Sequence, residues 1–268
     1  MELLHALILA VIQGITEFLP ISSSGHLILA PHLFGWPDQG LLFDIAANTG
    51  TLAAVILYFR HEFVGLVRGF FRSLAEKGVE GNPEGRLAWL IALATLPAGI
   101  VGLLFKEIIA TYARNPLLIG ANAIVFGLLM GLADYLGKRR RTLDQITWKD
   151  ALLIGCAQAM ALNPGTSRSG ITITAGLFAG FDRGDAARFS FLMFIPIGII
   201  AGIFGLMKLL GQTLSPEEWA FFGVGFVGSA LTGFAVIHWL LTWLRSHSLM
   251  VFVVYRLLLA IAIFSLAR

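Results

Sequence analysis

The chain has 268 residues, of which 57% are hydrophobic and 13% are charged, and its formal net charge is +3. Soluble domains carry roughly 25% charged residues, so this composition, with a mean hydropathy of +0.82, excludes a soluble protein and predicts an integral membrane protein. The small positive charge is better explained by Lys and Arg in loops between membrane spans than by a nucleic-acid surface, so no nucleic-acid partner is expected.

The first apolar region, about residues 3–35, is interrupted in its middle by Leu19-Pro20-Ile21-Ser22. Proline removes a backbone donor and disfavours helix at the residue before it. We therefore predict two short helices that fold back on themselves as a re-entrant hairpin. Such backbone is tolerated at membrane depth only where it lines a polar cavity.

Six further segments are apolar and long enough, at about 20 residues, to cross a bilayer as helices. They are approximately residues 41–60, 86–105, 116–136, 187–210, 219–243 and 249–267. No linker or low-complexity stretch separates them, so residues 1–268 are predicted to form a single all-α membrane domain.

A second interrupted region, about residues 151–181, lies between the third and fourth spans and contains Asn163-Pro164-Gly165. We predict a second re-entrant hairpin here, for the same reason as in the first region. Residues 144 apart match in the two regions: Pro20 and Pro164, Ser23 and Ser167, Asp38 and Asp182, Gly40 and Gly184. The matches predict an internal repeat, with residues 1–136 as the first copy and residues 145–268 as the second.

Lys and Arg are concentrated in two loops, after the first span and at residues 137–150, and two spans separate these loops. The positive-inside rule places both loops in the cytoplasm. The first hairpin then enters the membrane from outside and the second from inside, which is typical of an inverted-topology repeat. We expect the two hairpin tips to meet near the bilayer midplane.

The first tip places a carboxylate, three serines and a histidine in apolar surroundings. Gln13 and Glu17 share a helix face, and Ser22, Ser23, Ser24 and His26 follow them. The second tip, PGTSRSGIT at 164–172, supplies Arg168 among hydroxyl groups and the start of a helix. A cation, several hydroxyl groups and a helix N-terminus together are suited to binding a phosphate group. Glu17 is a candidate metal ligand and His26 a candidate for proton transfer.

Three explanations of this pattern stay open from the residues alone. The first is structural: Glu17 and Arg168 form a buried ion pair that holds the hairpins together, and the serines bond their own backbone. The second is a transporter site for an anionic solute or lipid. The third is a membrane-embedded enzyme acting on phosphate, with Ser23 as nucleophile if a base lies within reach. Opposite charges within the membrane are costly, which disfavours the structural explanation.

Both tips carry long motifs of a known family. QGITEFLPISSSGH, at 13–26, resembles the paired-acid and FLP-(V/I)-SSxGH segments of the undecaprenyl-diphosphate phosphatase family, also called bacitracin-resistance proteins. PGTSRSGIT resembles the family's PGxSRSxxT segment, and the resemblance extends to ARFSFLMFIP at 187–196 and YRLLLA at 255–260. The resemblance therefore covers nearly the whole chain.

The resemblance implies six transmembrane helices plus two re-entrant helical hairpins in an inverted-topology repeat, in a homodimer in the bacterial cytoplasmic (inner) membrane. The implied reaction is hydrolysis of undecaprenyl diphosphate to undecaprenyl phosphate and inorganic phosphate, with a divalent cation, Mg²⁺ or Ca²⁺, as cofactor. This reaction recycles the lipid carrier of peptidoglycan synthesis and gives tolerance to the antibiotic bacitracin. The substrate is a polyprenyl diphosphate lipid.

Carried over to this sequence, the resemblance implies catalytic roles for Glu17, Ser23, His26 and Arg168. Arg168 would bind the diphosphate, and Glu17 would hold the metal or activate the attacking group. Ser23 is the candidate nucleophile with His26 as its acid/base partner, and direct attack by a metal-activated water is the alternative. The implied substrate-binding residues are Gln13, Ser22, Ser24, Gly165, Thr166, Ser167, Ser169 and Thr172.

The chain departs from the family pattern at two positions. Asn48 stands where glutamine is expected, and Arg188 stands where a carboxylate is common. The resemblance suggests a catalytic pocket that opens to the outer face of the membrane. An inverted repeat also permits transport, so a secondary transporter or flippase for an anionic, phosphorylated lipid is the alternative function.

Overall fold

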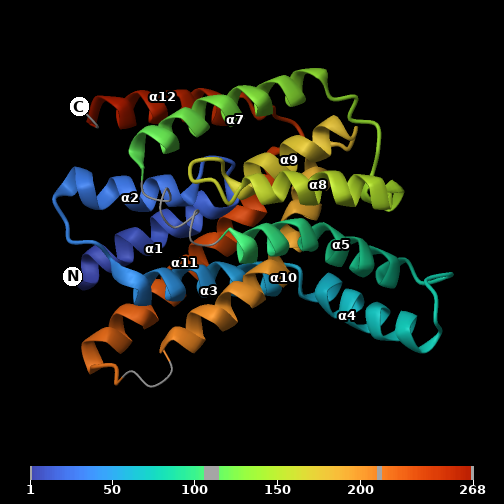
Figure 1. The fold of residues 1–268 in the computed structure, drawn as a ribbon, viewed down its shortest axis with the longest axis horizontal. Helices are drawn as coiled ribbons and strands as arrows, with labels where there is room; N and C mark the ends of the chain where they lie inside the picture. The colour runs from blue at the N-terminus through green and yellow to red at the C-terminus, as the bar shows by residue number, and fades with distance from the viewer. Residues whose placement is uncertain (1, 106–114, 210–212, 267–268) are drawn as a thin grey trace.

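The computed structural model describes residues 2–105, 115–209 and 213–266, which form helices joined by loops without any strand (Figure 1). The helices are α1 (Leu3–Phe18), α2 (Ser23–Phe34), α3 (Gly40–Tyr58), α4 (Arg60–Ala75), α5 (Pro83–Leu104), α7 (Pro116–Leu136), the 3₁₀ helix η1 (Leu143–Gln145), α8 (Trp148–Met160), α9 (Arg168–Phe178), α10 (Arg183–Leu209), α11 (Pro216–Trp243) and α12 (Met250–Leu266). The prediction of an all-α protein is therefore confirmed for the described residues.

Within these residues, five helices are long and apolar enough to cross a membrane: α3, α5, α7, α10 and α11. The sixth predicted span is α12, whose 17 residues fall at the short end of the roughly 17–25 residues that a spanning helix needs. The predicted ends of two spans, residues 210 and 267, lie outside the described residues. A multi-pass membrane protein is thus confirmed, and the count of six crossings stays a prediction.

Three of the spanning helices begin with a capping side chain followed by proline. The Asn82 side chain accepts from Gly85 N before α5, and Asn115 accepts from the first N–H groups of α7. Ser215 forms a capping box with Glu218 at the start of α11. These side chains satisfy backbone donors that the first helical turn leaves free, and proline at the first position costs no hydrogen bond. The spans therefore have sharply defined starts.

Helix is interrupted at both predicted places. The first interruption, between α1 and α2, ends at Ser22, and the second, between α8 and α9, ends at Ser167. Both serines adopt left-handed backbone conformations, with φ of 75° and 69°. Such conformations are strained for residues other than glycine and persist only where the surrounding structure enforces them. We call the two interruptions, residues 19–22 and 161–167, the first and second breaks.

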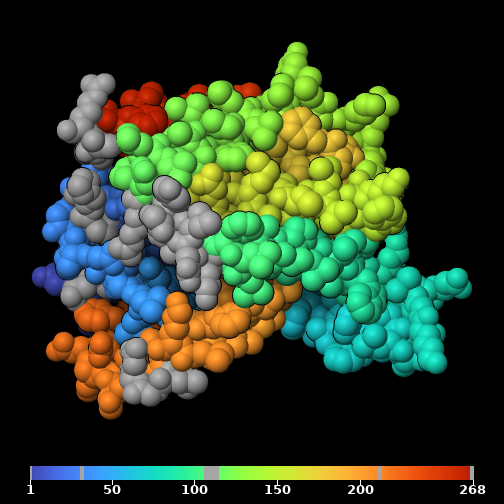
Figure 2. Space-filling model, viewed as in Figure 1, coloured from blue at the N-terminus to red at the C-terminus, as the bar shows by residue number. Residues whose placement is uncertain are grey.

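Two of the short helices next to the breaks, α1 and α8, each pack against a span from the other half of the chain. Helix α1 packs against α11, and α8 packs against α5 (Figure 1). The backbones approach closely, since a Cβ added to Gly14 would lie 2.7 Å from Thr232 and one added to Gly155 would lie 2.5 Å from Ala94 O. Helix α4 and the turn that joins it to α5 project at one end of the molecule (Figure 2). The broken helices are thus held by close packing in the centre.

The loop before α8 is tied to the end of α9 by one arginine. The Arg141 guanidinium donates to both carboxylate oxygens of Asp150, at 2.9 and 2.6 Å, and also to the carbonyl of Ala179. Thr147 donates to the same carboxylate through its backbone N–H and its hydroxyl. The start of α8 and the end of α9 are therefore joined through Arg141, whose ion pair with Asp150 is also hydrogen-bonded. We call this arrangement of Arg141, Thr147 and Asp150 the clamp.

This clamp predicts a loss of stability in acid. Burial raises the pKa of Asp150, but hydrogen bonds from Arg141 and Thr147 outweigh burial, so the pKa lies below its ordinary value. A carboxyl whose pKa is lowered by folding stabilises the protein above its unfolded pKa, and this contribution is lost as the pH falls through the folded pKa. We expect the melting temperature in detergent to fall more steeply below about pH 4 for the wild type than for Asp150→Asn. Parallel pH curves for the two proteins would contradict this expectation.

Candidate functional site

The two breaks, far apart in the sequence, meet at one cavity of about 110 Å³. Its lining residues are Thr16, Glu17, Ser22, Ser23, Ser24, Ala161, Ser167 and Arg168. All of them except Thr16 and Ala161 are residues that the sequence analysis singled out. The predicted junction of the two tips is therefore present as a shared cavity lined by a carboxylate, a guanidinium and several hydroxyl groups.

Glu17 is the central group of this cavity. Its Oε1 accepts from Arg168 Nη2 at 3.0 Å, and its Oε2 accepts from Ser23 Oγ at 2.6 Å and from Gln13 Nε2 at 3.2 Å. The Glu17 and Arg168 side chains are only 10% and 15% exposed. Hydrogen bonds to a carboxylate at these distances are strong. A single carboxylate therefore links the two breaks and is also a base within reach of the Ser23 hydroxyl.

Arg168 is the first residue of α9 and is held from a second side by α10. Its guanidinium lies over the Phe194 ring, 4.0 Å from the ring centre. Its Nη1 also lies 3.4 Å from the carbonyl of Ser190. A guanidinium stacked on an aromatic face keeps its donor edge free for a planar or tetrahedral anion. Because Arg168 also begins a helix, the positive end of the α9 dipole lies beside the same cavity.

No hydrogen bond joins His26 to Ser23 in the structure, in contrast to the pairing that the family resemblance implies. Its Nδ1 lies 2.7 Å from the carbonyl of Ser22, and its Nε2 lies 2.7 Å from the Tyr255 hydroxyl. The reason is that α2 begins at Ser23, so the imidazole folds back along this helix onto the carbonyl four residues earlier. The base that contacts Ser23 is Glu17, and His26 connects the first break to α12.

Two of the predicted substrate-binding residues join elements of the protein. Ser169 Oγ lies 3.3 Å from the carbonyl of Glu17 and 3.2 Å from that of Leu19, so it ties the end of α1 to α9. Thr172 Oγ1 lies 2.8 Å from the carbonyl of Arg168 and 2.6 Å from Ser190 Oγ. Neither side chain lines the cavity. Both hold the backbone that carries the cavity-lining groups.

The two residues before Ser167 are also buried behind the cavity. Gly165 has a φ of 85°, and a Cβ there would lie 2.4 Å from the carbonyl of Ile119, so only glycine fits. Thr166 is fully buried, and its hydroxyl has no hydrogen-bond partner among the described residues. An unpaired buried hydroxyl is costly in a protein interior. Gly165 therefore fixes the shape of the second break, whereas the Thr166 hydroxyl adds no hydrogen bond to it among the described residues.

Arg256 of α12 reaches both breaks and was missed by the sequence analysis. It is fully buried and donates to the carbonyls of Pro20 in the first break and of Gly165 and Thr166 in the second. A signal was present in the sequence, because a lone arginine in the apolar segment 249–267 is expensive unless it has a purpose. The chain-wide resemblance included this segment without assigning a role to the arginine.

The oxygen atoms around Glu17 fit a hard divalent cation that also binds a substrate. No group of three or more His, Cys, Asp or Glu side chains lies together in the described parts of the chain. Gln13 Oε1, however, is buried and has no hydrogen-bond partner in the described parts of the structure, while Gln13 Nε2 donates to Glu17 and to Asn48 Oδ1, the latter at 3.3 Å. Mg²⁺ is often held by one or two protein oxygens plus substrate phosphates and water. The donor set fits such a shared site.

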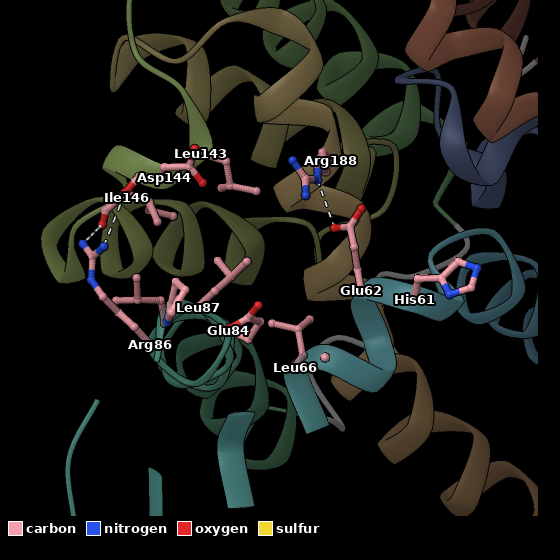
Figure 3. Close-up of a pocket in the computed structure, with 13 residues that line it drawn as sticks. His61, Glu62, Leu66, Glu84, Arg86, Leu87, Leu143, Asp144, Ile146 and Arg188 are labelled. Atoms are coloured by element: carbon pink, nitrogen blue, oxygen red, sulfur yellow. Dashed lines mark hydrogen bonds and ion pairs between the residues drawn. The ribbon is translucent and has the colours of Figure 1, made fainter. Parts of the chain in front are cut away.

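A larger cavity, of about 550 Å³, lies between α4, α5, η1 and α10 (Figure 3). Its arginines are already engaged: Arg188 pairs with Glu62 at 3.0 Å, and Arg86 donates to the carbonyls of Asp144 and Ile146. None of the predicted catalytic or substrate-binding residues lines it. Arg188 therefore forms an ion pair in a separate cavity. The arginine at this position, where a carboxylate is common in the family, does not line the cavity between the two breaks.

Comparisons with known proteins match the chain from end to end. The family model described as bacitracin resistance protein BacA matches residues 6–262. An undecaprenyl-diphosphatase of Magnetococcus marinus is 52% identical over 267 residues, which cover 99% of each chain. Undecaprenyl-diphosphatase 2 of Stutzerimonas stutzeri is 50% identical over 97% of this chain and 96% of its own length. An undecaprenyl-diphosphatase of Saccharophagus degradans is 51% identical over 99% and 98%, respectively.

Proposed function

Because the chain belongs to the bacitracin resistance protein BacA family, we propose that it is a membrane-embedded hydrolase acting on undecaprenyl diphosphate. It converts this lipid to undecaprenyl phosphate and inorganic phosphate, and so recycles the carrier of cell-wall precursors. The observation that carries the proposal is the Arg168–Glu17–Ser23 arrangement at the junction of the two breaks. It combines an anion-binding group, a base and a hydroxyl in one buried cavity.

The diphosphate binds with its terminal phosphate beside Arg168 and the start of α9. The guanidinium and the helix dipole neutralise the charge that builds up on the phosphate oxygens in the transition state. Ser22, Ser24 and Ser167 line the same cavity and supply further polar contacts, and Gln13 lies next to it through its hydrogen bond to Glu17. The isoprenoid tail stays in the bilayer, so the substrate enters from the membrane.

Ser23 is the nucleophile favoured by the 2.6 Å contact with Glu17. Its Oγ attacks the terminal phosphorus while its proton passes to Glu17. The bond from that phosphorus to the bridging oxygen breaks, and its electron pair leaves with undecaprenyl phosphate. Water then hydrolyses the phosphoserine, which releases inorganic phosphate and restores the Ser23 hydroxyl, and Glu17 releases its proton to solvent. In the competing route, water attacks directly and Ser23 only orients it.

A divalent cation, Mg²⁺ or Ca²⁺, is the proposed cofactor. Glu17 and Gln13 Oε1 would hold it together with phosphate oxygens of the substrate. When bound, it supplies positive charge that offsets the negative charge of the diphosphate. His26 lies one helical turn from Ser23 and its bond to Tyr255 orients its ring, which is suited to a supporting proton-transfer role once substrate binds.

The membrane arrangement follows the same proposal. Helices α1–α2 and α8–α9 form two re-entrant hairpins, in an inverted repeat of residues 1–136 and 145–268. Supporting this, each break ends in a left-handed serine, and α1 and α8 each pack against a span from the other half. The protein resides in the bacterial cytoplasmic membrane as a homodimer, without a nucleic-acid partner, and the pocket opens to the outer face.

Purified protein in detergent, given farnesyl or undecaprenyl diphosphate and Mg²⁺, is expected to release inorganic phosphate. Release should stop with EDTA, which removes the divalent cation, because the negative charges of the diphosphate and Glu17 then repel each other. Release should return when excess Mg²⁺ or Ca²⁺ is added. A colorimetric phosphate assay measures both effects. Saturable binding of the diphosphate without phosphate release under any divalent cation would contradict the hydrolase and favour the transporter.

A further inference from the structure

All five N–H donors of Arg256 are used by backbone carbonyls from three elements. Nε donates to Ala123 O at 3.1 Å and Nη2 to Asn122 O at 3.2 Å, both in α7. Nη2 also donates to Gly165 O at 2.9 Å. Nη1 donates to Thr166 O at 2.9 Å and to Pro20 O at 3.3 Å. One side chain thus fixes α7, the first break and the second break relative to one another.

The charge of Arg256 has no carboxylate partner among the described residues. The arginines that form ion pairs there are Arg72, Arg141, Arg168, Arg183 and Arg188. A fully buried guanidinium is expensive unless it is paired or surrounded by well-oriented dipoles. Carbonyl dipoles supply part of that compensation for Arg256. Residues of the same two breaks, Ser22 and Ser167 among them, line the cavity.

The hydrogen bond from Arg256 to Thr166 O fixes the orientation of the peptide group between Thr166 and Ser167. The C=O and N–H groups of one trans peptide point in opposite directions. Because Thr166 O points at Arg256, the N–H of Ser167 in the same peptide points away from it. Ser167 lines the cavity, and its N–H has no hydrogen-bond partner among the described residues. Within the described structure, the Ser167 N–H is therefore an unpaired backbone donor of a cavity-lining residue, next to Arg168 in the chain.

We propose that Arg256 is a positioning residue that aims the Ser167 N–H, and with it the start of α9, at the phosphate. It acts through the backbone of the two breaks and does not touch the substrate. The inference rests on the proposed function, and it adds an anion-binding backbone donor and the side chain that orients it. Asn122 supports the same arrangement, since its Nδ2 donates to Pro164 O at 2.7 Å.

Two glycines of α7 give a matched test that avoids the breaks themselves. A Cβ added to Gly127 would lie 3.3 Å from Arg256 Cβ and 3.4 Å from its Nε, so Gly127→Ala displaces Arg256 slightly. A Cβ added to Gly131, one turn along the same helix, would lie 3.3 Å from Val253 Cγ2. The two substitutions gain the same helix propensity and cause similar crowding. They differ in whether the neighbour is Arg256.

We expect Gly127→Ala to lower kcat several-fold with little change in melting temperature, and Gly131→Ala to turn over like the wild type. Arg256→Lys keeps the charge but loses the fork of donors, so its kcat should fall about 100-fold while KM changes less. Inorganic phosphate, as a competitive inhibitor, should bind more weakly to Gly127→Ala than to Gly131→Ala, because the Ser167 N–H is misaimed. A purely structural role would lower melting temperature and leave kcat per folded molecule unchanged.

Equal kcat and equal phosphate inhibition for Gly127→Ala and Gly131→Ala would overturn the inference, as would wild-type kcat in folded Arg256→Lys. If Arg256→Lys does not fold, the alanine pair decides the question alone. If neither the wild type nor Gly131→Ala releases phosphate, the proposed function fails instead. Calorimetric binding of inorganic pyrophosphate to the alanine pair then tests the inference separately: weaker binding to Gly127→Ala supports it, and equal binding refutes it.

Discussion

Replacing Arg168 with alanine is expected to lower phosphate release about 1,000-fold or more, by analogy with other arginines that stabilise phosphoryl-transfer transition states. Arg168 supplies the paired guanidinium at the junction of the breaks, and its position over Phe194 sets the direction of its donors. Steady-state phosphate release with Mg²⁺ measures the effect. Arg168→Lys should recover little activity, because an ammonium group neither stacks on the ring nor donates in a planar fork.

Arg188→Ala is the matched control for Arg168→Ala. Arg188 pairs with Glu62 in the separate cavity between α4 and α10, where both side chains are partly exposed (Figure 3). An ion pair of this kind contributes at most about 1 kcal/mol to stability. We expect Arg188→Ala to keep turnover within a few-fold of the wild type. If Arg168→Ala retained more than a tenth of wild-type turnover, the assignment of Arg168 to the diphosphate would be wrong.

Replacing Ser23 with alanine is expected to reduce turnover at least about 1,000-fold, because removing a catalytic nucleophile usually costs that much or more. Ser24→Ala is the comparison, since Ser24 lines the same cavity but its hydroxyl bonds Ser22 at 3.2 Å and does not contact Glu17. Its loss should be about tenfold or less. Steady-state phosphate release compares the two variants.

A chemical trap distinguishes the two proposed routes independently of rates. In the serine route, acid quenching during turnover should capture a phosphoserine on the peptide that contains Ser23, detectable by mass spectrometry. Turnover of Ser23→Ala within tenfold of the wild type, together with no phosphopeptide, would rule out the serine route. Glu17 would then act on an attacking water, which Ser23 helps to orient.

The spans and the two breaks could be predicted because their signals are local. Apolar length alone located α3 at Gly40–Tyr58, against a predicted 41–60, and α7 at Pro116–Leu136, against a predicted 116–136. Proline followed by a run rich in serine, threonine and glycine located both breaks, because proline removes a backbone donor and the small polar residues after it do not favour continued helix. Proline alone would not have sufficed, since Pro97 and Pro196 lie inside unbroken α5 and α10. The described part of α12, Met250–Leu266, has 17 residues, and the predicted end of this span at residue 267 lies outside the described residues.

The contacts at the site were harder to predict because they depend on how the helices are rotated and packed. The family resemblance implied His26 as the acid/base partner of Ser23, but the start of α2 at Ser23 turns the imidazole towards Ser22 O and Tyr255. Glu17 reaches Ser23 only because the chain reverses direction at the first break. Arg256 lies far from both motifs in sequence, and its bonds are all to backbone carbonyls, which no side-chain pattern reveals.

The most direct test of the account is where a diphosphate binds. A photoreactive benzophenone-bearing isoprenyl diphosphate analogue, cross-linked to the purified protein with Mg²⁺, would be mapped by mass spectrometry of the labelled peptides. We expect labelling of the segments around both breaks, residues 19–24 and 161–169, and we expect excess inorganic pyrophosphate and Arg168→Ala to suppress it. Suppressible labelling confined to the cavity between α4, α5 and α10, with both breaks unlabelled, would contradict this expectation.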